Sequence, residues 1–325
     1  MVLQTNIIAV GGGKGGIGKS ILCTNLAVGM ALCGKNVVLM DTDFGASNLH
    51  ALLGVDTPPH GFGDFFHKNS HDPESLLLDT GIRGLKFVCG AGDNPGSANL
   101  NEKNTAVIAD FIRNLDADFV FLDLAPGTSH NVIDFFNLCD TGLVITTPEI
   151  TSVMKTFSFI RAALFRRISK AFAGNPGLQR LVDHSNPANA DIETSSIRVL
   201  KDKLLEQDPD QLHVVESIVN SFKPGLIVNR VRYKKDLVVG GDLIQLVKKY
   251  LDVETDYLGY LIESDRVRDS VDEMVPFLIQ EPESAPSQNL QKIIGALTHT
   301  DLKLIQKDGE IFISQQAQLF PDLNT

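Results

Sequence analysis

Two lysines lie close together in a glycine-rich stretch near the start of the chain. The stretch reads AVGGGKGGIGKSILCTNLA over residues 9–27, and Gly13 to Ser20 within it fit the pattern G-x-x-x-x-G-K-[ST]. In that pattern the glycine N–H groups wrap phosphates, the final lysine reaches the β- and γ-phosphates, and the hydroxyl binds Mg²⁺. These roles fall on Lys19 and Ser20. The pattern needs only one lysine, so Lys14 requires its own explanation.

Carboxylates end two apolar segments that have the composition of buried strands. Asp123 ends FVFLD, and a single carboxylate delivered by an apolar strand beside a phosphate loop typically supports Mg²⁺. Asp41 and Asp43 end VVLMDTD, where a carboxylate near the γ-phosphate can orient the attacking water. Each pair alone could be a helix cap or a solvated strand end. Next to a phosphate loop, the nucleotide site is the favoured interpretation.

The elements that must position these residues alternate along the chain. Helices are expected at about residues 20–32, 102–115 and after 151. Strands are expected within the segments NIIAV, GKNVVLMDTD (after an initial turn), LKFVCGAG, DFVFLDLAPG, TGLVITTPE, GLIVNRV and YLGYLIES. Alternation of this kind predicts a doubly wound α/β fold of the P-loop NTPase type, with a mostly parallel sheet of about seven to eight strands and helices on both faces. Ligands then bind at the carboxyl ends of the strands.

Composition limits the classes of protein that fit. The 325-residue chain carries a formal charge of −11, which disfavours broad adhesion to DNA or anionic membranes but leaves local basic faces open. Its four cysteines are scattered without a CxxC pair, which argues against a single-chain zinc or iron–sulfur site. No apolar run reaches the ~18–20 residues that span a bilayer. The expected location is cytoplasmic, with a peripheral place at the inner face of the cell membrane left open.

Several segments resemble motifs of the MinD/ParA superfamily of deviant Walker A ATPases. GKGGIGKS resembles its P-loop with the additional lysine, DTDFGASNLHALLG its switch I and DLAPGTSHNVID its switch II. TTPEITSV resembles the segment after the fifth strand, and LIVNRV the strand whose Asn contacts adenine. VPFLIQEPESAPS is most similar to the FlhG (FleN) side of the MinD branch.

This resemblance implies ATP and Mg²⁺ as cofactors, slow hydrolysis and a homodimer that forms with ATP. It explains Lys14 as the lysine that crosses the dimer interface to the partner's phosphates. It also implies that Asp43 positions water. The implied catalytic residues are Lys14, Lys19 and Asp43, and the implied Mg²⁺ residues are Ser20, Asp43 and Asp123. The implied ATP-binding residues are Gly13, Lys14, Gly15, Gly16, Ile17, Gly18, Lys19, Ser20, Asn229 and Arg230.

The expected organisation is a single ATPase domain over residues 1–298 and a C-terminal tail over 299–325. Residues 174–212 are rich in Asn, Pro, Asp and Gln and read as a surface insertion, with one helical stretch near 192–206. The insertion is either a solvated excursion or a docking element for a partner. Relatives of the MinD branch bind membranes through a basic amphipathic C-terminal helix. This tail has two lysines and four acids, so packing on the domain is favoured over membrane contact.

The helix expected after Thr151 combines a buried stripe with a basic face. Its stripe consists of Val153, Phe157, Ile160, Leu164, Ile168 and Phe172, which recur at helical spacing. Its basic residues are Arg161, Arg166, Arg167 and Lys170, followed by Arg180. A solvated face is the ordinary interpretation. Binding to DNA, an acidic protein or lipid headgroups is the alternative.

The leading functional hypothesis is an ATPase switch that regulates spatial positioning in cell division or flagellar placement, with a protein regulator as partner. A ParA-like ATPase that partitions DNA or cargo is the first alternative. A nucleotide-dependent scaffold without turnover and an Mrp-type metal-cluster carrier are further alternatives. The C-terminal CxxC motif of such carriers is missing from this sequence, which counts against that alternative. A bacterial tyrosine kinase would end in a tyrosine cluster, and the tyrosines stop at Tyr260.

Overall fold

The structure is a computed structural model of the chain. It describes residues 5–44, 48–56, 61–62, 73–90, 102–185, 196–298, 301–307 and 310–316. Within these ranges the chain divides into two compact units. Unit 1 is Met1–Asn6, Gly18–Asp123 and Leu258–Thr325, and unit 2 is Ile7–Ile17 and Leu124–Tyr257. The boundary falls inside the glycine-rich motif, between Ile17 and Gly18.

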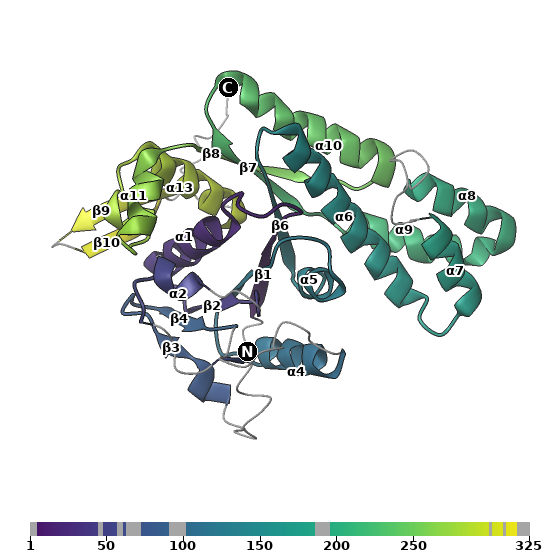
Figure 1. The fold of residues 1–325 in the computed structure, drawn as a ribbon, viewed down its shortest axis with the longest axis horizontal. Helices are drawn as coiled ribbons and strands as arrows, with labels where there is room; N and C mark the ends of the chain where they lie inside the picture. The colour runs from purple at the N-terminus through teal and green to yellow at the C-terminus, as the bar shows by residue number, and fades with distance from the viewer. Residues whose placement is uncertain are drawn as a thin grey trace, which may run out of the picture. The chain divides into compact units, whose positions relative to one another are not determined.

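Eight strands form one mostly parallel sheet in the order β3-β4-β2-β5-β1-β6-β7-β8 (Figure 1). The seven strands expected from the sequence are confirmed, and β3, a short antiparallel edge strand, is additional. The strands span β1 Asn6–Gly11, β2 Val37–Asp41, β3 Leu78–Asp79, β4 Leu85–Val88, β5 Phe119–Asp123, β6 Thr141–Thr146, β7 Gly225–Val231 and β8 Asp256–Ile262. The doubly wound α/β fold class is therefore confirmed.

Helices connect these strands, as parallel pairing requires. In unit 1 they are α1 Lys19–Leu32, α2 Leu49–Leu52, α4 Glu102–Arg113, α11 Asp265–Asp272, α12 Phe277–Gln280 and α13 Ala285–Thr298, with the 3₁₀ turn η1 Pro73–Leu76. In unit 2 they are α5 His130–Phe136, α6 Ile150–Ala171, α7 Pro176–Ser185, α8 Ile197–Gln207, α9 Leu212–Ser221 and α10 Val238–Leu251, with the 3₁₀ turns η2 Pro209–Gln211 and η3 Lys234–Leu237.

Unit 1 is built around α1, which packs against β2 and β5 on one side and α12 and α13 on another. Every residue of β2 is buried, as expected for a parallel strand covered on both faces. In register, β2 and β5 pair from Val37 with Phe119 to Asp41 with Asp123. This register brings the two terminal aspartates side by side at the carboxyl end of the sheet, where the sequence predicted a ligand site.

Unit 2 is built around the 22-residue helix α6, which packs on β6 and contacts α5, α7, α9 and α10. Figure 1 shows α6 and α10 side by side, with α7, α8 and α9 gathered at the carboxyl end of α6. The predicted buried stripe of α6 is confirmed except at Val153, which is half-buried. The described part of the segment predicted to be an insertion, residues 174–212, contains α7 and α8, which pack on each other, and α7 also packs on α6.

The tail contains two strands, β9 Asp301–Lys307 and β10 Glu310–Gln316, paired antiparallel. The sequence predicted packing of the tail on the domain but no strands in it. Among the described helices, none combines the length and apolar character needed to cross a membrane.

Candidate functional site

Unit 1 contains the last part of the glycine-rich motif, Gly18 to Ser20, at the start of α1. Gly18 precedes the helix with φ 88°, a left-handed conformation that glycine adopts without strain, and Lys19 is the first helical residue. The N–H groups of the first turn of an α-helix have no partner within the helix. Such N–H groups and the helix dipole make this helix start an anion site. Lys19 and Ser20 therefore stand where a phosphate-binding loop requires them.

Lys19 is buried together with acidic partners rather than extended into water. Its residue is only 6% exposed, and Asp41 and Asp123 are 2% and 4% exposed. Both Asp123 and Asp43 attract its ammonium group electrostatically. The predicted Walker-type residues of this unit, Lys19, Ser20, Asp43 and Asp123, are thus brought together.

Burial dominates the protonation of this cluster. The pKa of Asp123 is raised to about 7, first by burial and next by the neighbouring Asp41 carboxylate, while a hydrogen bond from Ser20 and the charge of Lys19 oppose the rise. The pKa of Lys19 is lowered by burial, although Asp123 and Asp43 favour its charged form. Both shifts disfavour the ions, because desolvation outweighs their mutual attraction here. A bound divalent cation and phosphate would reverse that balance.

The two aspartates that end VVLMDTD have different surroundings. Asp41 accepts hydrogen bonds from the backbone N–H of Asp43 at 2.9 Å and of Leu49 at 3.4 Å, so it fixes the start of the following segment. Asp43 is only half-buried. Asp43 is therefore the more accessible of the two carboxylates, and Asp41 holds the local backbone.

The residues present fit a Mg²⁺ ion. The buried Oδ1 atom of Asp123 has no hydrogen-bond partner. Ser20 supplies a hydroxyl next to the same carboxylate, through the hydrogen bond that it donates. Carboxylate, hydroxyl and phosphate oxygens are the donors that Mg²⁺ prefers. An unpaired carboxylate oxygen buried at this point is costly unless a cation binds it.

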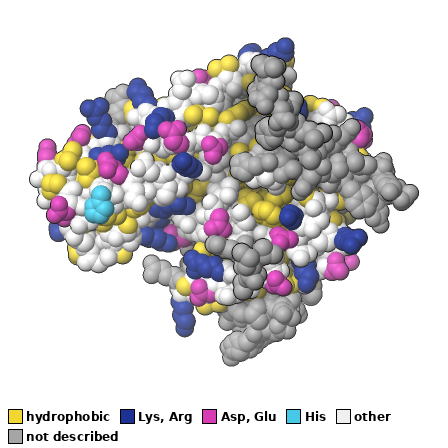
Figure 2. Space-filling model, turned by 180° about the vertical axis from the view of Figure 1, so that it is seen from behind, with side chains coloured by type: hydrophobic (Ala, Val, Ile, Leu, Met, Phe, Trp, Pro, Cys, Tyr) yellow, Lys and Arg dark blue, Asp and Glu magenta, His cyan; other side chains and the backbone are white. Residues whose placement is uncertain are grey.

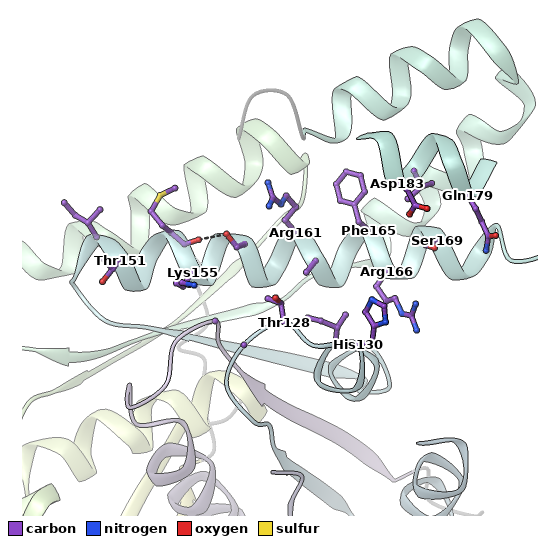
Figure 3. Close-up of a pocket in the computed structure, with 18 residues that line it drawn as sticks. Thr128, His130, Thr151, Lys155, Arg161, Phe165, Arg166, Ser169, Gln179 and Asp183 are labelled. Atoms are coloured by element: carbon purple, nitrogen blue, oxygen red, sulfur yellow. Dashed lines mark hydrogen bonds between the residues drawn. The ribbon is translucent and has the colours of Figure 1, made fainter. Parts of the chain in front are cut away.

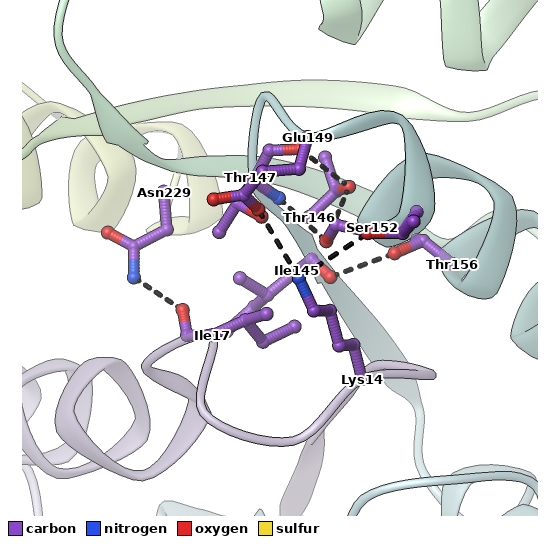
Figure 4. A network of polar contacts seen from close by, with 10 residues as sticks. Lys14, Ile17, Ile145, Thr146, Thr147, Glu149, Ser152, Thr156 and Asn229 are labelled. Atoms are coloured by element: carbon purple, nitrogen blue, oxygen red, sulfur yellow. Dashed lines mark hydrogen bonds and ion pairs between the residues drawn. The ribbon is translucent and has the colours of Figure 1, made fainter.

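The half of the motif in unit 2 holds Lys14 at the surface (Figure 4). Its Nζ lies 3.6 Å from the Glu149 carboxylate and 3.5 Å from the Thr151 hydroxyl. The pKa of Glu149 is lowered, first by a hydrogen bond from Thr147 and also by the charge of Lys14. The Lys14 side chain is 39% exposed and that of Glu149 is 56% exposed. Lys14 is thus held by the start of α6 through a weak, solvent-accessible ion pair.

The sequence did not indicate that Glu149 and Thr151 bind Lys14. A signal existed, because both belong to the TTPEITSV segment on which the family resemblance partly depends. That segment is also ordered internally, since the Ser152 hydroxyl accepts the N–H of Thr147 at 3.0 Å.

Asn229, the expected adenine contact, is tied to the phosphate loop. Its side-chain amide donates to the Ile17 carbonyl at 2.7 Å (Figure 4), and its side-chain oxygen accepts the N–H of Arg230 at 2.9 Å. Ile17 is buried, whereas Gly15 and Gly16 are exposed. Arg230 is exposed and has a φ of 57°, which is unusual for a residue other than glycine. Asn229 keeps part of its hydrogen-bonding capacity for a ligand.

A groove of about 990 Å³ runs along α6 beside the loop (Figure 3). It is lined from Gly13 past Thr151 and Lys155 to Phe165 on α6 and Asp183 on α7. A side chain at position 13 would place its Cβ 2.1 Å from the Lys155 carbonyl oxygen. Gly13 is therefore needed for the loop to lie against the α6 backbone, in addition to any contact with phosphate.

The basic face predicted on α6 is largely paired. Arg166 and Lys170 both bind the Asp134 carboxylate at 2.8 Å, and Arg167 stacks over the Phe222 ring at 4.7 Å. Arg161 is half-buried. On the face shown in Figure 2, Lys and Arg side chains are interspersed with Asp and Glu. Contact of the Arg161–Lys170 face with DNA stays a prediction, with fewer unpaired charges than the sequence indicated.

Comparison with known proteins places these features in a family. The family model described as ParA, NUBPL iron-transfer P-loop NTPase, matches residues 4–168. The septum site-determining protein MinD of Helicobacter pylori is 30% identical over 148 residues, which are 45% of this chain and 54% of MinD. The antiactivator FleN of Pseudomonas aeruginosa is 31% identical over 159 residues, which are 48% of this chain and 55% of FleN.

The chain spans about half the length of the curated relatives it matches. A solved structure of MinD from Pyrococcus horikoshii in complex with Mg-ADP superposes with a TM-score of 0.61 at 18% identity. That superposition covers 90% of this chain and 96% of the MinD chain. It supports the fold observed here.

Proposed function

The chain belongs to the ParA family of P-loop NTPases, and from that premise we propose that it is a Mg²⁺-dependent ATPase that works as a molecular switch. One observation carries the proposal. The protein has two lysines in one loop with opposite surroundings, since Lys19 is buried among acids and Lys14 lies at the surface. The first suits binding and hydrolysis, and the second suits contact with another subunit.

The proposed chemistry is positioning and charge stabilisation. The backbone N–H groups of Gly15 to Ser20 and the Lys19 ammonium hold the phosphates. Asp43 orients the attacking water. Ser20 and Asp123 hold Mg²⁺, with Asp43 close to its shell, and the ion supplies neutralisation of charge on the phosphate oxygens.

The switch depends on Lys14. In the proposed ATP-bound homodimer, Lys14 leaves Glu149 and Thr151 and contacts the phosphates in the partner subunit. Two nucleotides that face each other concentrate negative charge, and one lysine from each side offsets it. Hydrolysis removes the γ-phosphate and with it part of the attraction that holds the dimer. ATP would therefore favour the dimer and ADP the monomer.

The proposed role is spatial regulation, as the names of the MinD and FleN relatives suggest, exercised through a protein regulator. A ParA-like partitioning ATPase is the alternative within the same chemistry. A metal-cluster carrier has some support from the iron-transfer description of the family model. Cys23, Cys89 and Cys139 are buried and separate, and the described residues include no group of three or more His, Cys, Asp or Glu able to hold a metal ion. Metal analysis of the purified protein tests that alternative directly.

Light scattering on Asp43→Ala is the first test. We expect a dimer with ATP and Mg²⁺ and a monomer with ADP, because the variant binds ATP without orienting the water. Lys14→Ala is the matched control, and should bind ATP through Lys19 yet remain monomeric. A mass that is independent of nucleotide in both variants contradicts the switch and favours a scaffold. Dimerisation by Lys14→Ala contradicts the role of Lys14 alone.

A further inference from the structure

The connection from β7 into α10 concentrates positive charge in a chain that is acidic as a whole. We call residues 230–238 the basic loop. Its four cations, Arg230, Arg232, Lys234 and Lys235, are all exposed, while the complete chain has a formal charge of −11. The loop lies in unit 2, directly after Asn229, and its first residue, Arg230, is one of the ATP-binding residues that the family resemblance implied.

The one acid in the basic loop is turned toward its own backbone. The Asp236 carboxylate accepts the N–H groups of Arg232 and Tyr233, each at 2.9 Å. These hydrogen bonds to the backbone are the main reason that the pKa of Asp236 is lowered. Asp236 thus fixes the turn that presents the cations. Over residues 230–242 the cations outnumber the acids by four to two, the second acid being the exposed Asp242.

Large apolar side chains are exposed at the same place. Tyr233 is 63% exposed, Val238 is 61% exposed, and Tyr257 on β8 is 43% exposed. Tyr257 lies against the first turns of α10, because a Cβ at Gly240 would be 2.7 Å from its ring. Of the eight large hydrophobic side chains exposed in the described residues, three therefore gather here. Lys235 lies 5.3 Å above the ring of Tyr233, so charge and aromatic surface are interleaved.

We infer that the basic loop, with Tyr257, is a docking surface for an anionic lipid bilayer. Lys and Arg near such a surface are attracted by anionic headgroups, and tyrosines partition to the interface between headgroups and acyl chains. Duplex DNA would use the cations but would leave Val238 and the tyrosine rings without a role, because protein–DNA interfaces are more polar. The exposed apolar side chains therefore favour a lipid bilayer over DNA as the partner of this surface.

Four cations and three apolar side chains give weak binding for a single copy. Stable membrane attachment generally takes two membrane-binding elements, and two copies of one surface in the same dimer bind with a higher overall affinity than one copy. Apart from Arg230, which the resemblance assigned to the ATP site, the docking surface consists of residues outside the nucleotide site, and the inference does not depend on ATP hydrolysis. If the ATP-bound dimer forms, it should bind vesicles more tightly than the monomer.

Vesicle co-sedimentation of the full chain tests the inference. The probes are vesicles of phosphatidylcholine alone and of phosphatidylglycerol and phosphatidylcholine in a one-to-three ratio, with duplex DNA in a parallel binding assay. We expect salt-sensitive binding to the anionic vesicles alone. Lys234→Glu/Lys235→Glu should weaken it by on the order of 30-fold or more. Val238→Ser should weaken it by about threefold to tenfold without changing the charge.

A second charge-reversal variant controls for net charge. Arg180→Glu/Lys223→Glu makes the same change at two exposed positions of unit 2, on α7 and just before β7 at the opposite end of that strand. It should bind vesicles within about twofold of the parent protein. Equal loss in this variant, or no binding by the parent protein, overturns the inference. Binding to DNA that requires Lys234 and Lys235, with vesicles ignored, overturns it in favour of a nucleic-acid surface. ATP binding measured in each variant separates these outcomes from misfolding.

Discussion

Lys14 and Lys19 are five positions apart in one loop, and their surroundings differ in almost every physical respect. Lys19 belongs to unit 1, is nearly inaccessible to water and shares its site with Asp123 and Asp43. Lys14 belongs to unit 2 and holds the exposed Glu149 across 3.6 Å. A buried lysine is committed to its site, because losing its partners would leave a charge without solvent. A surface ion pair is worth about 0–1 kcal/mol, so Lys14 can exchange partners at little cost.

The largest expected effect is loss of nucleotide binding in Lys19→Ala. Charge-assisted hydrogen bonds from a buried lysine to phosphate contribute about 3 kcal/mol, so the Kd for ATP should rise by on the order of 100-fold. Isothermal titration calorimetry measures this. The matched variant Lys14→Ala should change the Kd of the monomer by less than about threefold, because Lys14 is bound elsewhere in its own subunit. Equal losses in the two variants would show that both lysines bind the same nucleotide.

Asp123 should make the stability of the ligand-free protein depend on pH. Its pKa is raised to about 7 from an ordinary value near 3.8, so the folded state binds more protons than the unfolded state between these values. The contribution of Asp123 to the free energy of unfolding therefore falls as pH rises from about 4 to about 7, by about 1.4 kcal/mol per pKa unit. Asp123→Asn removes this dependence. At pH 8 the variant should unfold at a higher temperature than the parent protein.

With ATP and Mg²⁺ added at pH 8, the parent protein should unfold at a higher temperature than Asp123→Asn. The parent protein gains stability because the cation occupies the Asp123 carboxylate, and Asp123→Asn gains little. Differential scanning fluorimetry at pH 5 and pH 8, with and without ligand, gives the four unfolding temperatures of each protein. If the difference between the two proteins does not change with pH, the buried carboxylate is already ionised in the ligand-free protein and the assigned pKa is wrong.

Asp41 and Asp43 offer a second comparison, between two aspartates of unit 1 with different surroundings. Asp41→Ala removes an acceptor from two backbone N–H groups, so the free energy of unfolding should fall by about 1–3 kcal/mol. Asp43→Ala should cost less than about 1 kcal/mol, because Asp43 is half-buried. Urea denaturation at pH 7.5 measures both. A larger loss in Asp43→Ala would exchange the structural and ligand-facing roles of the two aspartates.

The parts of this site that local sequence determines were predictable. The sequence predicted that Lys19 and Asp123 share one site, and the structure brings them together. A glycine loop before a helix and an apolar strand with one terminal carboxylate each define a position without help from the rest of the chain. Their roles toward a nucleotide stay predictions. The family resemblance implied a role for Asp43 in positioning water, but the different surroundings of Asp41 and Asp43 do not follow from the local sequence. They depend on the register of β2 with β5, which buries Asp41 beside Asp123 and leaves Asp43 past the strand.

Contacts between residues that are distant in the sequence account for other features that were not predicted. The ion pair of Lys14 with Glu149 joins residues far apart in the chain, and only the packing of the loop on α6 brings them together. Arg166 and Lys170 were predicted to be solvated, but α5 supplies Asp134 to both. The pairing of β9 with β10 had a local signal in the sequence, since an Asp-Gly pair at residues 308–309 separates two apolar segments.

Glu149→Gln gives the smallest and most specific effect in this comparison. The substitution keeps the size of the side chain and removes the charge that holds Lys14, so the unfolding free energy should change by less than about 1 kcal/mol. If Lys14 must leave Glu149 to reach the partner subunit, then dimerisation of the Asp43→Ala background with ATP should strengthen by a few-fold, to about fivefold at most for such a pair. Light scattering across a concentration series measures the dimer dissociation constant. Glu254→Gln, which removes an exposed partner of Lys248, is the control and should leave that constant unchanged. Weaker dimerisation in Glu149→Gln would mean that Glu149 itself stabilises the dimer, and Lys14 would then carry its partner with it across the interface.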